Sequence, residues 1–332
     1  MQIIAYIFLA LIIAGFLFQL ISSYIDEIKY KPPGRIINSD GVKFHILEKG
    51  KPVKGRPNVI LDMGLGGNLL YWHEVQEDIA KFAKVISFDR AGIGWSLRSS
   101  KPRTSTNIIE ETRNMLVKAG IKPPYILVGH SFAGLNARLY AKKYPDEVVG
   151  IVLVDSSHEM QNLSLPKAKS LMNQVLDRPY LHLPLRFLSR IGVIRLYRKF
   201  SSDSGTFKNK EIGHLARIKE SSNKFIDTII DEWRVFDANL ESARNLDKSL
   251  GNLPLTVITA AMGISPETCA LHGHFSMDRC KKAHKVWHEC QKDLLTRSSN
   301  SRQILAKNST HIIQQCEPKL IVSAVKDMLD SL

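Results

Sequence analysis

From residue 35 onward, short apolar runs alternate with longer amphipathic stretches along the chain. The apolar runs have the length and branched side chains of buried strands, and they cover residues 58–61, 83–89, 125–128, 148–154, 253–261 and 303–306. Helical periodicity covers residues 71–82, 104–119, 132–143, 287–295 and 318–329. Because strands and helices alternate with short connections, the pattern predicts an α/β fold with a mostly parallel sheet and helices on both faces.

Two further stretches complete this pattern. Residues 35–37 and 42–48 flank the turn-forming sequence Asn38-Ser39-Asp40-Gly41, which predicts a β-hairpin. Residues 156–252 are rich in helix formers, and we predict no strand in them. We therefore expect a core made of residues 35–155 and 253–332, interrupted by a helical cap of residues 156–252.

The N-terminal segment differs from the rest, because its first 25 residues carry no charged side chain. As a helix they would span about 37 Å at ~1.5 Å per residue, enough to cross a hydrocarbon core of ~30 Å. A cleaved signal peptide is the alternative, but no Lys or Arg precedes the apolar run, and no small-x-small cleavage site is clear before Tyr24. We predict a single-pass membrane anchor followed by a Pro-Pro-Gly-containing linker, residues 26–34. Lys29, Lys31 and Arg35 favour the cytoplasmic side for the main domain.

The net charge of the chain is a second feature that favours contact with a membrane. The 332 residues include 46 Lys and Arg against 32 Asp and Glu, a formal net charge of +14. No block rich in Lys and Arg with interleaved aromatic residues stands out, so nucleic-acid binding is not predicted. Attraction to an anionic membrane surface explains the dispersed charge more simply. The amphipathic run 183–196 contains Arg186, Arg190 and Arg195, and it either packs on the core or lies on such a surface.

One strand-to-helix junction carries a motif with chemical meaning. The strand predicted at 125–128 runs into Gly129-His130-Ser131-Phe132-Ala133, where a helix begins at once. So sharp a turn needs small residues two positions before and after Ser131, and Gly129 and Ala133 satisfy this requirement. The turn holds the serine hydroxyl at a helix N-terminus, which favours developing negative charge.

This junction resembles the nucleophile elbow G-x-S-x-G of the α/β-hydrolase superfamily, with Ala133 in place of the second glycine. Three more segments resemble that family in the same order along the chain: the Gly-rich loop 62–68, the D-R-x-G-x-G-x-S segment 89–96, and His311 on a loop after the last predicted strand. The resemblance implies an eight-stranded, mostly parallel sheet and a helical cap that shapes the substrate pocket. Segment 89–96 is expected to be structural, with its Asp and Arg bracing the loop.

The resemblance also implies catalytic roles. Ser131 would be the nucleophile and His311 its general base. The backbone N–H groups of Leu65 and Phe132 would form the oxyanion hole.

The acid that orients His311 has more than one candidate. Asp155 lies directly after a buried strand, and Glu267 follows the next predicted strand at a somewhat greater distance. We favour Asp155, with Glu267 as the alternative acid and Asp278 and Asp293 as more remote ones.

These residues predict a serine hydrolase of the carboxylesterase or lipase type, acting on small-molecule or acyl-chain esters without a cofactor or metal. The same triad would serve an aminopeptidase similar to proline iminopeptidases, which needs a cap acid to bind the substrate amine. The cap offers Glu220, Asp231, Glu232 and Asp237. A catalytically inactive, hydrolase-like binding protein is a third alternative, because Ala133 and the acid position depart from the family pattern.

The cysteines form a second group of candidate residues. Cys280, His284 and His288 have helical i, i+4, i+8 spacing, which suits a metal site, although the spacing matches no common zinc signature. A Cys269–Cys280 disulfide is the expectation for an exported domain, and free thiols are expected for a cytosolic one.

Overall fold

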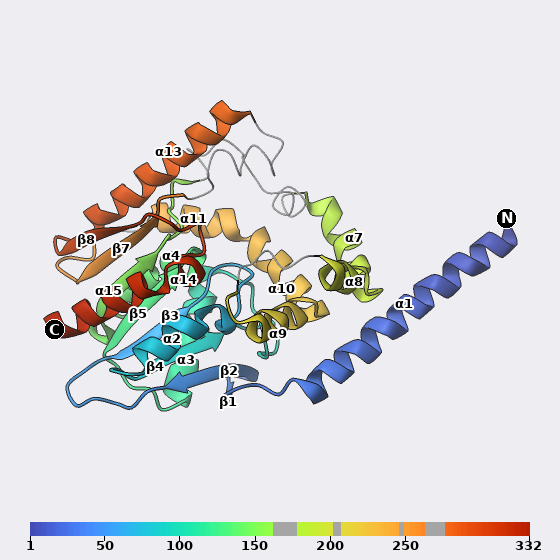
Figure 1. The fold of residues 1–332 in the computed structure, drawn as a ribbon, viewed down its shortest axis with the longest axis horizontal. Helices are drawn as coiled ribbons and strands as arrows, with labels where there is room; N and C mark the ends of the chain where they lie inside the picture. Colours follow the sequence, from blue (N-terminus) through green and yellow to red (C-terminus); the bar gives the residue numbers. More distant parts are fainter. Residues whose placement is uncertain (162–177, 202–206, 246–248, 263–275) are drawn as a thin grey trace.

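The computed structural model describes residues 1–161, 178–201, 207–245, 249–262 and 276–332 (Figure 1). Its centre is an eight-stranded sheet with the order β1-β2-β4-β3-β5-β6-β7-β8. β1 and β2 are antiparallel to their neighbours and the other strands are parallel, which confirms the predicted sheet. The strands are β1 (Arg35–Ser39), β2 (Val42–Lys49), β3 (Asn58–Asp62), β4 (Val85–Asp89), β5 (Tyr125–His130), β6 (Val148–Val154), β7 (Leu255–Ala260) and β8 (Ser301–Ala306).

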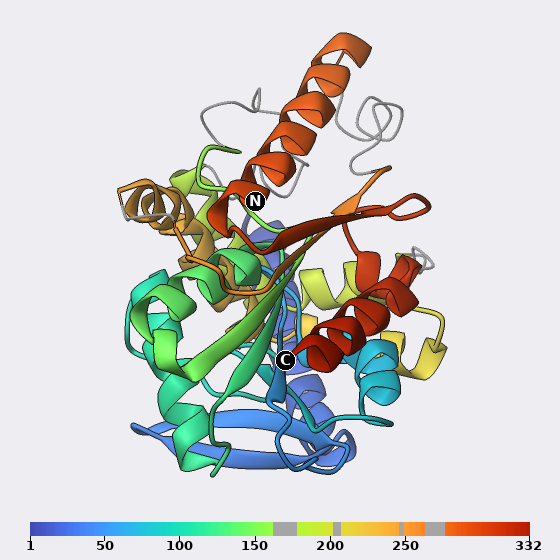
Figure 2. The same cartoon turned by 90° about the vertical axis from the view of Figure 1, so that its left-hand side faces the viewer.

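Helices cover both faces of this sheet (Figure 2). Helices α3 and α4 pack on one face, and α2, α14 and α15 pack on the other. The core helices are α2 (His73–Ile79), α3 (Ser105–Lys118), α4 (Phe132–Lys143), α13 (Met277–Asp293), α14 (Ile313–Cys316) and α15 (Pro318–Ser331).

The central strands are apolar at successive positions because both of their faces are buried. In β5, Ile126 and Val128 pack with the side chains of α2 and α15, whereas Leu127 packs with those of α3 and α4. This two-sided burial explains why the strands appear in the sequence as continuous apolar runs. By contrast, the β1–β2 hairpin closes through Asp40 and Gly41, whose φ values of +52° and +79° suit a two-residue turn.

The described part of the cap is helical and contains no strand. Its helices are α7 (Pro179–Arg190), α8 (Val193–Phe200), α9 (Lys210–Glu220), α10 (Asn223–Arg234) and α11 (Phe236–Arg244). The predicted amphipathic run 183–196 is divided at Gly192, whose φ of +74° interrupts the helix.

Two helices extend beyond their predicted bounds. Helix α1 (Gln2–Lys29) continues past residue 25 into the predicted linker, and its N-terminal end extends beyond the rest of the molecule (Figure 1). Helix α13 begins ten residues before the predicted start at 287, because its first turns are rich in charged residues and give no apolar period.

Asp89, at the end of β4, is a fully buried acceptor that joins three segments. Its carboxylate accepts hydrogen bonds from Nδ1 of His45 at 2.7 Å and from the backbone N–H groups of Leu69 at 2.9 Å and Trp95 at 3.1 Å. Segment 89–96 is therefore structural. The predicted Asp–Arg bracing differs in detail, because Asp89 and Arg90 bind separate partners.

Replacement of Asp89 by alanine is expected to lower the free energy of unfolding by about 2–5 kcal/mol, because it leaves several buried donors without an acceptor. Urea unfolding of the detergent-solubilised chain, followed by circular dichroism, measures this change. The matched control is Asp330→Ala, which removes only an exposed ion pair with Arg56 and should cost less than about 0.5 kcal/mol. Equal stabilities of the two variants would contradict the role given to Asp89.

Candidate active site

Ser131 lies between β5 and α4 in a strained backbone conformation, with φ +52° and ψ −120°. The turn around it is tight, since a β-carbon at Gly129 would lie 2.6 Å from the carbonyl oxygen of Ala133. Ala133 itself is fully buried, so the turn has room for its methyl group. The closest approach comes one residue later, where a β-carbon at Gly134 would lie 2.2 Å from Oγ of Ser156. The elbow geometry therefore tolerates alanine at 133 and needs glycine at 129 and 134.

Asp155 and His311 are brought into direct contact. Asp155 directly follows β6, which lies beside β5, and its Oδ2 accepts a hydrogen bond from Nδ1 of His311 at 2.6 Å. The other oxygen, Oδ1, accepts from the N–H of Ala260 at 3.1 Å and from Nε1 of Trp287 at 3.0 Å. Because Asp155 is 1% exposed and fully bonded, its orientation is fixed. A proton on Nδ1 leaves the Nε2 lone pair of His311 available to accept another.

His130 connects the loop of His311 to the elbow. Its Nε2 donates a hydrogen bond to the carbonyl oxygen of His311 at 2.8 Å, and the centroids of the two imidazole rings lie 4.6 Å apart. Burial lowers the pKa of His130 well below its ordinary value, and the neighbouring His311 lowers it further, so the ring stays neutral. Within the described part of the chain, no hydrogen bond joins Ser131 Oγ to His311. Such contacts are often longer in a free enzyme than in its substrate complex.

The other candidate acids have different surroundings. Glu267 lies outside the described residues. Asp278 is exposed on α13, and Asp293 bonds to His158 and Arg297. Among the described residues, Asp155 is the carboxylate that contacts His311.

The Gly-rich loop lies against the elbow. A β-carbon at Gly64 would approach the β-carbon of Ser131 to 2.8 Å, so the loop backbone packs directly on the serine. Neither the N–H of Leu65 nor that of Phe132 donates a hydrogen bond to another described residue. The two N–H groups predicted to bind an oxyanion are therefore unpaired within this part of the chain.

Arg90 holds the backbone of the Gly-rich loop in place. Its guanidinium donates to the carbonyl oxygen of Gly64 at 3.0 Å and also to that of Met63. Two carboxylates hold it in place: Asp62 of β3 at 2.9 Å and Glu232 of the cap helix α10 at 3.1 Å. Burial alone would lower the pKa of Arg90, but Glu232 and Asp62 raise it overall, so Arg90 is a permanent cation.

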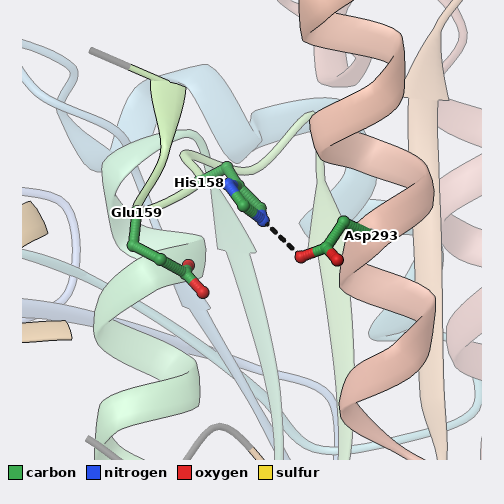
Figure 3. Close-up of side chains that lie close together, drawn as sticks. All are labelled: His158, Glu159 and Asp293. Atoms are coloured by element: carbon green, nitrogen blue, oxygen red, sulfur yellow. Dashed lines mark hydrogen bonds and ion pairs between the residues drawn. The ribbon is translucent and has the colours of Figure 1, made fainter. Parts of the chain in front are cut away.

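A second cluster of ligand-type residues contains His158, Glu159 and Asp293 (Figure 3). His158 Nδ1 accepts a hydrogen bond from the backbone, so Nε2 carries the proton and donates to Asp293 at 2.8 Å. Arg138 and Arg297 bind Glu159 at 2.9 and 2.7 Å. Burial would raise the pKa of Glu159, but Arg138 and its other cationic neighbours lower it to about 2. Both carboxylates are already neutralised, so the cluster is an ion-pair network and does not fit a cation.

The cysteine and histidine group does not form the alternative metal site. Cys280 is disulfide-bonded, so it offers no thiolate, and Nε2 of His284 bonds to the carbonyl oxygen of Ala261 at 3.0 Å. The predicted partner Cys269 lies outside the described residues. A disulfide at Cys280 is the state predicted for an exported domain, in contrast to the free thiols predicted for a cytosolic one.

Several functional neighbours gave no usable signal in the sequence. The sequence pattern identifies Trp287 only as a helix residue and Glu232 only as a possible amine-binding acid. His130 occupies a variable position of the elbow motif. Each acts through a partner distant in the chain, which local patterns cannot specify.

A surface hollow of about 450 Å³ lies on the cap and is lined by residues of α7 and α10 and by Arg98, with no member of the candidate triad.

Comparison with known proteins agrees with this architecture. A family model described as the alpha/beta hydrolase fold matches residues 57–229, just over half of the chain. The Bacillus subtilis protein YqjL is 25% identical over 293 residues, which cover 87% of this chain and 89% of YqjL. The pig protein 1-acylglycerol-3-phosphate O-acyltransferase ABHD5 is 33% identical over 133 residues, or 38% of this chain and 36% of that protein. Two other relatives match over only 38% and 39% of their own length.

Solved structures share the fold at low sequence identity. ALR0039, a putative alpha/beta hydrolase from Nostoc sp. PCC 7120, superposes with a TM-score of 0.68 at 17% identity, and the match covers 90% of this chain and 98% of that one. With the sheet order, the elbow and the family match together, the chain belongs to the α/β-hydrolase family.

Proposed function

We propose that this protein is a serine hydrolase that cleaves carboxylic esters, with Ser131 as nucleophile, His311 as general base and Asp155 as the orienting acid. The observation that carries the proposal is the 2.6 Å contact between Asp155 Oδ2 and His311 Nδ1, beside a serine in the strained elbow conformation. Strain of this kind persists only where the surrounding structure enforces it, and it is typical of functional sites.

The proposed reaction follows from this geometry. Oγ of Ser131 attacks the ester carbonyl carbon while Nε2 of His311 takes the hydroxyl proton, and Asp155 stabilises the resulting imidazolium. The carbonyl electron pair moves to oxygen, where the N–H groups of Leu65 and Phe132 bind the oxyanion. The tetrahedral intermediate then expels the alkoxide, which receives the proton from His311 and leaves an acyl-enzyme. Water then attacks the acyl carbon while His311 takes its proton. The second tetrahedral intermediate expels Ser131, which regains the proton, and the carboxylic acid product is released.

Arg90 has a positioning role in this mechanism. The carbonyl of Gly64 and the N–H of Leu65 belong to one trans peptide group, so they point in opposite directions. By holding the Gly64 oxygen, Arg90 directs the Leu65 N–H away from itself and toward the elbow. Glu232 of the cap completes the arrangement by holding the guanidinium.

Ester cleavage is favoured over aminopeptidase activity by the state of the cap acids. An aminopeptidase needs a carboxylate free to bind the substrate ammonium. Three of the four candidate acids are neutralised by arginine: Glu220 by Arg198, Asp231 by Arg98 and Arg186, and Glu232 by Arg90. The fourth, Asp237, also has an interaction partner.

Acyl transfer to an alcohol is the second candidate function. The acyl-enzyme can pass its acyl group to an alcohol as readily as to water, if the alcohol occupies the site. The partial similarity to the acyltransferase ABHD5 is the observation that favours testing this outcome.

We also propose that α1 anchors the protein in a membrane. The helix has 28 residues, and its most apolar window has a mean hydropathy of 2.6 and is only 6% buried, unlike the core helix of a soluble protein. Its length exceeds the ~20 residues needed to cross a bilayer.

A fluorophosphonate probe, which phosphonylates an activated serine with loss of fluoride, is expected to label the full-length chain in detergent. Labelling should be lost in Ser131→Ala and reduced at least about 100-fold in His311→Ala, because the nucleophile or its base is missing. The controls Ser301→Ala and His73→Ala should label like the wild type. Absence of labelling in a folded wild-type protein would overturn the proposal and favour an inactive, ligand-binding role.

Asp155→Asn is expected to lower kcat for a soluble aryl ester by about 10³–10⁴-fold without unfolding the protein, because the amide no longer fixes the tautomer of His311. Asp278→Asn and Asp293→Asn are matched controls that should keep kcat within about threefold. A large loss of kcat in Asp278→Asn, together with an active Asp155→Asn, would show that Asp278 and not Asp155 orients His311.

Arg90→Lys is expected to lower kcat about 10–100-fold with little change in KM, because lysine keeps the charge but cannot hold two carbonyls and two carboxylates at once. The matched control is Arg103→Lys, another buried arginine paired with a glutamate, which makes no hydrogen bond or ion pair to the Gly-rich loop among the described residues. If both variants lose activity equally, the effect comes from general destabilisation and the positioning role is wrong.

A further inference from the structure

Cap helices α7 and α8 expose large apolar side chains to their surroundings. Leu183 is 75% exposed, Tyr197 is 73% exposed and Phe200 is 79% exposed. Tyr180 and Phe187 are exposed on the same pair of helices. A soluble monomer rarely exposes so many large apolar side chains in one region unless they contact something else.

Helix α7 differs from an ordinary surface helix in where two of its arginines and two of its apolar side chains point. A helix at a water-exposed surface turns its charged side chains outward and its apolar stripe inward. Here Arg186 and Arg190 turn inward, where they bind Asp227 of α10 at 3.1 and 3.0 Å. Leu183 and Phe187 face outward. This arrangement suits an apolar environment outside the protein.

The turn between α7 and α8 packs closely on α1 (Figure 1). A β-carbon at Gly15 of α1 would lie 2.6 Å from the carbonyl oxygen of Ile191, and one at Gly192 would lie 2.7 Å from the ring of Phe18. Small residues on both sides therefore allow the backbones to approach, as at helix contacts within membranes.

A polar face of α1 fixes this contact. Gln19, Ser23 and Asp26 share one side of the helix and bind Arg195 of α8 at 2.9, 3.2 and 2.5 Å. Gln19 also donates to the carbonyl oxygen of Ser221, and it is only 1% exposed. The cap thus supplies partners for the polar residues in an otherwise apolar helix, and α1 is docked on the cap rather than attached as a loose tether.

The contact positions indicate how deep the cap lies. If the hydrocarbon core holds residues 2–21, about 20 residues or ~30 Å, then Gly15 lies about 9 Å inside its boundary. The α7–α8 turn that touches Gly15 must then lie at a similar depth. Interfacial helices bury their apolar faces by about 5–10 Å, which agrees with this estimate. Asp26 falls outside the hydrocarbon in the same arrangement.

We propose that α7 and α8 insert their outward faces into the lipid bilayer beside α1, so that anchor and cap form one membrane-embedded unit. The inference rests on the anchoring role proposed above for α1. It also favours esters dissolved in the bilayer as substrates, because the cap of the hydrolase would then lie among the lipid chains.

Site-directed photo-crosslinking of the full-length chain in phosphatidylcholine–phosphatidylglycerol vesicles tests this. The photoreactive residue p-benzoyl-phenylalanine replaces Leu183, Tyr197 or Phe200 in the cap, Leu9 in α1, or Leu305 on β8 as the control. All five side chains are exposed, so the replacements should be tolerated. After irradiation, mass spectrometry of the peptides measures lipid adducts.

Lipid adducts at 183, 197 and 200, at least about tenfold above those at 305 and similar to those at 9, are the expected result. Adducts at 9 without adducts at the cap positions would overturn the insertion of the cap and leave the anchor intact. No adducts at position 9 would overturn the anchor proposal and this inference with it. Crosslinks from 197 or 200 to a second copy of the chain would show that this face is a protein interface instead.

Discussion

The backbone conformation of Ser131 constrains most of what surrounds it. A positive φ at a residue with a β-carbon is unfavourable by itself, so the neighbouring packing must enforce it. Gly129 and Gly134 allow the strand and helix to close on the serine, and Gly64 allows the neighbouring loop to touch it. Asp155, at the end of the adjacent strand β6, also has a positive φ of +42°. Two strained residues, each directly after one of two neighbouring strands, thus place the candidate chemistry at one edge of the sheet.

Arg90 extends this constraint from the sheet to the cap. It contacts β3 through Asp62, the Gly-rich loop through two carbonyl oxygens, and α10 through Glu232. A buried ion pair of this kind contributes little net stability, because desolvation offsets most of its Coulomb energy. Its value lies in geometry, since it joins the position of a cap helix to the direction of one backbone N–H. A shift of helix α10 in the cap would therefore change the direction of this N–H group, even if the cap does not touch the substrate.

The sequence predicted the sheet well because its strands give local signals, and the elbow was proposed from a local motif. Buried parallel strands appear as apolar runs, and the elbow needs small residues at fixed positions around Ser131. The sequence favoured Asp155 but kept Glu267 as the alternative acid, because chain order does not specify which strand end meets the loop of His311. The start of α13 was missed because its exposed turns lack an apolar period. The roles of Glu232 and Gln19 depend on partners more than 140 residues away along the chain.

The docking of α1 on the cap has a consequence for how this architecture can change. A membrane helix that serves only as a tether can be exchanged for any other apolar helix of similar length. Here Gln19, Ser23 and Asp26 must match Arg195, and Gly15 must match the turn at Ile191. The N-terminal helix and the cap are therefore interlocking parts, and sequence changes in one require compensating changes in the other.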